Sequence, residues 1–324
     1  MIIRETHVFD PAETFFPVEL RPIFLNNSSS VMESKHIYTK LPRHKAVVDI
    51  ERNNAFSVVT DEYKLITNRY AFELAKDVME KVFKMTTIED MVCFNIIMPS
   101  KRSFCHIDLI HKSADFSPWE DDKWTAFIRI TNSYNRSRRL RYELGFCRWI
   151  CKNGMIFGDK SIEFSYAHTK KEVENIDRFV HNIGDIRKLE TKLIEELTQL
   201  KRYHVPEKQM LPILCRAFDI KVTDEVYKKP RRIESLSQMK DQVNKLTEKY
   251  FSQMGQHGYA ALNVLTDYAS RPEGVISQEA SINRLQQKAN NWMKNFIFSI
   301  QDVNFNFEKY VEEYNHTIKI INSL

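Results

Sequence analysis

The chain has 324 residues, of which 43% are hydrophobic and 28% are charged, and its net charge is +5. Such a chain can bury a sizeable core in one large domain or two ordinary ones. A net charge this small does not by itself indicate an anionic partner, so only local clusters of basic residues can do so. The first ten residues lack the pattern of a signal peptide, and no apolar run approaches the roughly 20 residues of a membrane span, so we expect a cytoplasmic protein.

Cysteine and glycine are both sparse. The five cysteines are scattered and odd in number, which argues against a disulfide framework and favours buried reduced thiols. Cys147 and Cys151 have C-x3-C spacing, but no second pair completes a zinc site. Seven glycines form neither a P-loop nor a dinucleotide-binding motif, so the sequence predicts no cofactor and no bound metal.

Residues 1–45 are predicted to form an irregular N-terminal arm laid over the rest of the chain. Prolines punctuate this segment at Pro11, Pro17, Pro22 and Pro42. Apolar clusters at residues 15–16 and 23–25 indicate that the arm docks rather than staying disordered.

Short runs rich in β-branched and aromatic residues follow, separated by turn-forming residues. They predict strands at residues 46–50, 56–60, 63–67, 91–98, 104–110, 124–131, 140–150 and 161–166. Between the third and fourth strands, Asn68 stands at an N-cap position, and apolar residues at helical spacing predict a helix over residues 69–84. Strands joined by short turns predict a mostly antiparallel sheet.

From Thr169 onward the apolar period changes from two residues to 3.6. Thr169 and Glu172 form a capping-box pattern that opens one long amphipathic helix over residues 170–203. We expect its apolar stripe to face the protein core, with a coiled coil or partner-binding helix as the alternative. Further helices are predicted at residues 207–218, 235–253, 258–269, 277–300 and 307–321.

These patterns together predict an α+β fold. The first half is expected to form a mostly antiparallel sheet with one or more helices, and the second half to be all-helical and packed against it. The predicted units are the N-terminal arm (1–45), an α+β domain (46–168) and a helical domain (169–324).

The strongest chemical signal lies between Asn132 and Met155. A polar turn joins two predicted strands there, and four arginines fall within the six residues from 136 to 141. Arginine forks pair with phosphates, and neighbouring aromatic rings can stack on bases. Together with a second basic run at 228–232, the predicted nucleic-acid-binding residues are Tyr134, Arg136, Arg138, Arg139, Arg141, Tyr142, Arg148, Lys152, Lys228, Lys229, Arg231 and Arg232.

A less specific interpretation of the same stretch is a solvated, charged face of the sheet. Strand alternation places Arg139 and Arg141 on one face and Leu140 and Tyr142 on the other, so Tyr142 would then belong to the core. On this interpretation the basic run at 228–232 is a solvated linker.

A weaker signal comes from His106 and Asp108, which share one face of a predicted strand. With His111 they suggest a metal site, but the spacing fixes no third or fourth ligand. Several acids follow in a predicted loop, at Asp115, Glu120, Asp121 and Asp122. We favour an exposed polar strand edge here, with a carboxylate-metal nuclease as the enzyme alternative, and we predict no catalytic residue.

Three stretches in order span most of the chain: VVTDEYKLITN (58–68), NSY to RWICKNG (132–154) and GYAALNVLTDY (258–268). They resemble the phage and plasmid-like proteins of the uncharacterised family DUF932. The resemblance implies carriage on a mobile element and brings no established activity with it. The His-Asp-Gly turn of the family is Tyr134-Asn135-Arg136 here, and the usual histidine after the third stretch is replaced by Ala269-Ser270, so any role of those groups is absent.

The leading hypothesis is a nucleic-acid-binding protein of a phage or plasmid, with single-stranded DNA as the candidate ligand. The second is a non-enzymatic protein that binds or inhibits a host or phage protein, or associates with itself, through its helical half. The third is a metal-dependent nuclease. The sequence leaves open DNA against RNA, strandedness and the oligomeric state.

Overall fold

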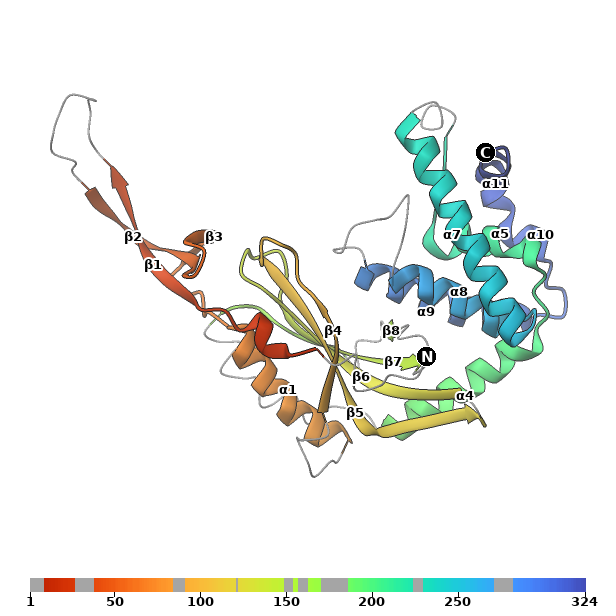
Figure 1. Cartoon of the computed structure of the whole chain (residues 1–324), viewed down its shortest axis with the longest axis horizontal. Helices are drawn as coiled ribbons and strands as arrows, with labels where there is room; N and C mark the ends of the chain where they lie inside the picture. Colours follow the sequence, from red (N-terminus) through yellow and green to blue (C-terminus); the bar gives the residue numbers. More distant parts are fainter. Residues whose placement is uncertain are drawn as a thin grey trace.

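The computed structural model describes residues 9–26, 38–83, 91–120, 122–148, 154–156, 163–169, 186–223, 230–270 and 282–324. Within these residues the fold is α+β, with two antiparallel sheets in the first half and most helices in the second (Figure 1). The change of apolar period near Thr169 therefore predicts the fold class correctly. None of the described helices is long and apolar enough to cross a membrane.

The smaller sheet contains β1 (Val18–Asn26), β2 (Tyr38–Asp49) and β3 (Asn54–Thr60) in that order. The expectation of an irregular arm over residues 1–45 is wrong, because β1 and part of β2 lie within it. Pro22 is compatible with a strand here because β1 lies at the edge of its sheet. On the open side of an edge strand there is no neighbouring strand to accept a hydrogen bond from the N–H that proline lacks. The sequence pattern alone predicts that this proline interrupts a strand.

One end of the smaller sheet is packed and the other protrudes. Phe16, Val18, Val47 and Val59 form a buried cluster with Tyr134 from the larger sheet. The opposite end of the β1–β2 hairpin extends away from the body of the molecule (Figure 1). Among the described residues, the buried contacts of the smaller sheet thus lie at one end.

The larger sheet has the order β4-β5-β6-β7-β8, and β9 pairs with β7 as well. Its strands are β4 (Met91–Ile97), β5 (Phe104–Trp119), β6 (Asp122–Ser133), β7 (Leu140–Arg148), β8 (Gly154–Ile156) and β9 (Glu163–Tyr166). All pairings are antiparallel, as the short connections predict. The predicted strand at residues 63–67 is wrong, because only Tyr63 there makes a bridge, to Thr169.

The predicted helix at 69–84 is confirmed as α1 (Asn68–Phe83). Its cap differs from the prediction: Thr67 Oγ1 accepts a hydrogen bond from the Tyr70 N–H at 3.2 Å. The Asn68 side chain instead donates to Thr14 O at 3.0 Å and accepts from Asn132 Nδ2 at 2.9 Å. Asn68 therefore ties the helix to the end of β6.

The described residues of the second half form helices and their connections, with no strand among them. Its elements are α4 (Ile186–Arg202), η6 (Glu207–Gln209), α5 (Met210–Phe218), α7 (Pro230–Met254), α8 (Gly258–Ser270), α9 (Ile282–Ile300), α10 (Phe307–Val311), η8 (Glu312–Tyr314) and α11 (Asn315–Asn322). The predicted helix start near Ser235 is wrong, because α7 begins at Pro230, a residue suited to a first helical turn. The first part of the helix predicted at 170–203 lies outside the described residues.

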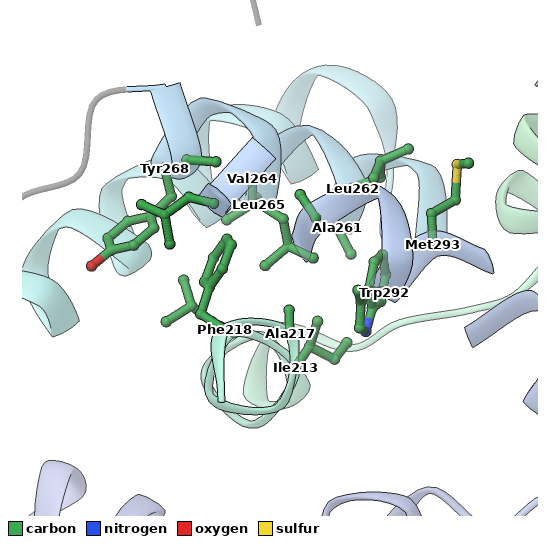
Figure 2. Close-up of a cluster of buried hydrophobic side chains, with 14 of the residues drawn as sticks. Ile213, Ala217, Phe218, Ala261, Leu262, Val264, Leu265, Tyr268, Trp292 and Met293 are labelled. Atoms are coloured by element: carbon green, nitrogen blue, oxygen red, sulfur yellow. The ribbon is translucent and has the colours of Figure 1, made fainter. Parts of the chain in front are cut away.

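Helix α8 is the centre of the bundle. Every residue from Gly258 to Ala269 is buried, and Figure 2 shows Leu265 and Ala261 facing side chains from α5 and α9, including Phe218 and Trp292. A helix that is apolar around most of its circumference is typical of a fully enclosed position.

Buried contacts join the bundle to the larger sheet. Arg129 Nη1 of β6 donates to Gln286 Oε1 of α9 at 2.6 Å, and Trp124 Nε1 donates to the Tyr259 hydroxyl of α8 at 3.2 Å. One cluster of buried hydrophobic residues runs from Ile66 to Ile321. The change of period at Thr169 therefore marks no break in the core.

Candidate anion-binding site

The arginine turn, residues 134–139, connects β6 to β7 and is held by its own side chains. Ser133 Oγ accepts from the Arg138 N–H at 3.0 Å and donates to the Arg138 carbonyl at 2.8 Å. Asn135 Oδ1 accepts from the Ser137 N–H at 3.1 Å, and Arg136 adopts a left-handed φ of 62°. These bonds fix the backbone that carries the three arginines of the turn, Arg136, Arg138 and Arg139.

Tyr134 anchors the turn from below. Its side chain is 1% exposed, and its ring lies 5.4 Å from Phe56 and 5.5 Å from Phe16. Its hydroxyl accepts from the Asn68 N–H at 2.9 Å. The prediction that Tyr134 contacts nucleic acid is wrong, since the ring is enclosed by protein on the core side of the turn.

Two other predicted contact residues are also buried. The Tyr142 hydroxyl donates to the Ala71 carbonyl of α1 at 2.9 Å, so Tyr142 belongs to the core, as strand alternation allowed. The guanidinium of Arg148 forms a buried ion pair with Asp122, to which the Tyr259 hydroxyl also donates. Both residues are therefore removed from the predicted binding surface.

The remaining arginines of the stretch lie at the surface to different degrees. Arg139 and Arg136 are exposed, and Arg136 Nη1 donates to the Val58 carbonyl of β3 at 3.4 Å. Arg138 is half-buried, with its guanidinium 4.3 Å from the centre of the Phe104 ring. Partial burial and then the nearby charge of Arg141 lower the pKa of Arg138. Arg141 itself lies 3.6 Å from Glu143.

The arginine turn forms one wall of a cavity of about 330 Å³. The other walls come from the end of β3 with the following turn and from the residues after β9. The full lining is Val59, Thr60, Glu62, Tyr63, Arg136, Ser137, Arg138, Arg139, Ala167, His168 and Thr169. Three arginines against one acid make this cavity strongly cationic.

A stacked pair of rings forms the aromatic wall. The Tyr63 and His168 rings lie 5.3 Å apart with 9° between their planes, and Tyr63 Oη is 3.1 Å from His168 Nδ1. Burial lowers the pKa of His168 to about 4, so this ring is neutral at pH 7. Burial also raises the pKa of Tyr63 to about 12, although Arg136 opposes the shift. His168 Nε2 is buried without a hydrogen-bond partner in the described structure.

The cavity therefore combines guanidinium groups with a flat, uncharged aromatic surface. Guanidinium groups bind phosphate oxygens through paired hydrogen bonds, and aromatic planes accept stacked bases. The sequence predicts the three arginines of this site, Arg136, Arg138 and Arg139, but neither Tyr63 nor His168. Tyr63 belongs to the first of the three recognised stretches, but the sequence carries no signal that pairs it with a residue 105 positions later.

The described arginines of the second basic run do not join this site. Arg231 and Arg232 lie in the first turn of α7, which Figure 1 places in the bundle, far from β3. Lys152, Lys228 and Lys229 lie outside the described residues.

The candidate metal ligands are buried in polar pairs. His106 Nδ1 lies 2.7 Å from Thr131 Oγ1, and both Asp108 carboxylate oxygens accept from Arg129. The expected exposed strand edge is wrong, since β5 is flanked by β4 and β6 and both side chains are enclosed. The described residues contain no group of three His, Cys, Asp or Glu side chains placed to hold a metal. The His111 side chain and Asp121 lie outside this description.

A model of the family described as "Domain of unknown function (DUF932)" matches residues 55–291. The matched region includes all three walls of the cavity. No curated protein and no solved structure matches the chain.

Proposed function

Because the chain belongs to the DUF932 family, whose description assigns no activity, we propose from the cavity itself that the protein binds nucleic acid. The phosphate backbone is held by Arg136, Arg138 and Arg139. The observation that carries this proposal is the convergence of these three arginines with the Tyr63–His168 ring pair around one cavity.

Preorganisation supports this function. Ser133 and Tyr134 hold the arginine turn before any ligand arrives, and Phe104 supports the Arg138 guanidinium. Groups already fixed in position lose less conformational entropy when they bind, so more of the ion-pair energy appears as affinity.

The ring pair favours a single strand over a duplex. Tyr63 is partly exposed and lines the cavity, so a base can reach it only when that base is not paired and stacked within a duplex. The family resemblance adds the expectation of a phage or plasmid protein, and the cytoplasm is the compartment in which such a ligand is met.

Salt titration of an Arg138→Ala/Arg139→Ala double variant tests the proposal. Labelled single-stranded and duplex DNA and RNA are titrated against wild type and variant over a range of salt concentrations. For single strands, each lost phosphate contact is expected to reduce the slope of log affinity against log salt by about 0.7. A Lys245→Ala/Lys319→Ala variant removes the same charge from exposed positions in the helical half and serves as the matched control.

Two results contradict the proposal. One is equal salt slopes and affinities for wild type and the arginine variant. The other is no binding by wild type at about 50 mM salt, where phosphate contacts are weakly screened. The first result would place the nucleic-acid contact outside the arginine turn, and the second would favour a protein partner, the second hypothesis drawn from the sequence.

A further inference from the structure

The outer half of the β1–β2 hairpin comprises residues 23–26 and 38–44. Phe24 is 53% exposed, Leu25 48% and Tyr38 59%. No residue of this outer half is buried, and Figure 1 shows the hairpin reaching beyond the rest of the described chain. Large apolar side chains that contribute nothing to a core are typical of a contact surface.

A break in the strand pairing gives this outer half its own direction. Pro22 pairs with Lys45 and Phe24 pairs with Lys40, so four residues of β2 stand opposite one residue of β1. Within the break Arg43 has a left-handed φ of 59°, and His44 Nδ1 lies 2.9 Å from the Pro42 carbonyl. Such irregularities bend a strand pair and redirect its side chains.

One face of the outer half carries two rings with a cation beside them. Phe24 is paired with Lys40, and Asn26 is paired with Tyr38. Directly paired residues of antiparallel strands project from the same face, and alternate residues along a strand share it. Phe24, Tyr38 and Lys40 therefore lie together on one side of the ribbon.

The charge of residues 23–26 and 38–44 is of one sign. Glu19 pairs with Arg21 near the base, and Asp49 is buried. The outer half carries Lys40 and Arg43 and no acidic residue. Because both charges are positive, they favour an anionic partner over a cationic or a purely apolar one.

The hairpin is continuous with the arginine cavity. His44 and Lys45 of β2 pair with Thr60 and Val59 of β3, two residues that line the cavity. A single nucleic-acid strand that leaves the cavity along β3 and β2 thus passes directly onto the outer half of the hairpin.

We propose that the outer hairpin is a second contact surface for the same single-stranded nucleic acid, on which bases stack against Phe24 and Tyr38 while Lys40 contacts phosphate. This inference rests on the proposed function of the arginine cavity. It adds that the protein binds an extended strand, and that affinity grows with strand length beyond what the cavity can hold.

Oligonucleotide length provides the test. Labelled single strands of about 4 and about 16 nucleotides, the range of site sizes for such proteins, are titrated against the full chain. Wild type is expected to bind the longer strand more tightly. In a Phe24→Ala/Tyr38→Ala variant the longer strand is expected to lose at least about tenfold in affinity, with an unchanged salt slope, while the shorter strand is unaffected.

The matched control is Phe298→Ala, which removes an aromatic side chain that is 80% exposed in α9. It is expected to bind both strands as wild type does. Circular dichroism and thermal melting check that the hairpin variant is folded, which is expected because neither ring belongs to a core cluster.

The outcomes separate the two proposals. If the hairpin variant binds both strands like wild type while Arg138→Ala/Arg139→Ala loses affinity, the hairpin inference fails and the cavity function stands. If only the hairpin variant loses affinity, the cavity function fails. If the hairpin variant binds both strands normally but no longer sediments with anionic lipid vesicles, the surface faces a membrane and the inference is overturned.

Discussion

The carboxylate of Asp108 receives two hydrogen bonds from the guanidinium of Arg129, both at 2.6 Å, and each residue is 1% exposed. Burial acts to lower the pKa of Arg129, but Asp108 outweighs it and the pKa is raised. The two residues therefore form a buried ion pair with no net charge that joins β5 to β6. Arg129 also donates a hydrogen bond to Gln286 of α9 and so links the pair to the helical bundle.

Removing one partner of this pair should leave an uncompensated buried charge. Asp108→Ala is expected to reduce the free energy of unfolding by about 3–5 kcal/mol, measured by chemical denaturation. The control is Asp115→Ala, whose partner Lys123 lies 3.6 Å away at the surface, and whose loss is expected to cost no more than about 1 kcal/mol. Similar losses of unfolding free energy in the two variants would show that the buried pair stabilises the fold no more than the surface pair does.

The same pairing predicts that His106 and Asp108 hold no metal. The positive charge of Arg129, which acts on His106 in this buried site, disfavours a second cation there, and Arg129 already occupies the carboxylate of Asp108. Elemental analysis of the purified protein is expected to find no stoichiometric metal. One tightly bound metal per chain, lost in His106→Ala, would restore the nuclease hypothesis.

Leu262 is enclosed in the centre of the helical bundle (Figure 2). Leu262→Ala is expected to cost about 2–5 kcal/mol of unfolding free energy, because the bundle can only partly close over the missing side chain. Denaturant melts of this variant and of the exposed Phe298→Ala provide the comparison. A change near zero for Leu262→Ala would mean that α8 is peripheral.

The contact between α8 and α4 leaves no room for a side chain at Gly258. A Cβ atom there would lie 2.9 Å from the Leu200 carbonyl oxygen, and the Gly258 N–H donates to the Tyr203 carbonyl at 2.9 Å. Gly258→Ala is expected to destabilise the protein by about 1–3 kcal/mol through overpacking. Thermal melting checks this, and an unchanged melting temperature would contradict the close approach.

His168 makes stability depend on pH. Its pKa is about 4 in the folded protein and near 6.5 when unfolded, so the unfolded chain binds more protons between these values. The stabilisation is complete above about pH 6.5 and is lost as pH falls toward 4, up to about 3 kcal/mol.

A His168→Phe variant keeps a flat ring beside Tyr63 but cannot take up this proton. Its unfolding free energy is expected to fall less than that of wild type between pH 7 and pH 4.5. Some dependence should remain, since the lowered pKa of His106 acts in the same direction. Identical pH profiles for the two proteins would contradict the assignment.

Local patterns predicted those parts of the fold that local residues control. The antiparallel strands, α1 and the helices of the second half follow from period and turn residues. The β1–β2 hairpin was missed because Pro22 and Pro42 read as breakers, whereas they lie on an edge strand and in the break of the pairing. Whether a proline interrupts a strand depends on the neighbouring strand, which the local pattern does not specify.

The site was predicted in part for the same reason. Arg136, Arg138 and Arg139 are adjacent in sequence, so their clustering is visible there. Tyr134 was assigned to the wrong side of its turn because its direction depends on Phe16 and Phe56, which come from other segments. His168 carries no local signal at all, since its environment is made by Tyr63.

The bridge between Tyr63 and Thr169 also bears on how the protein is made. Forming it closes a loop of more than a hundred residues, whose entropy must be overcome by contacts that form earlier in the intervening sheet. Arg136–Arg139 leave the ribosome before His168. A nascent chain therefore exposes these arginines before the residues that complete the cavity have been synthesised. We expect ligand recognition to be among the last properties that the first half acquires, and a chain that stops before residue 167 to lack it.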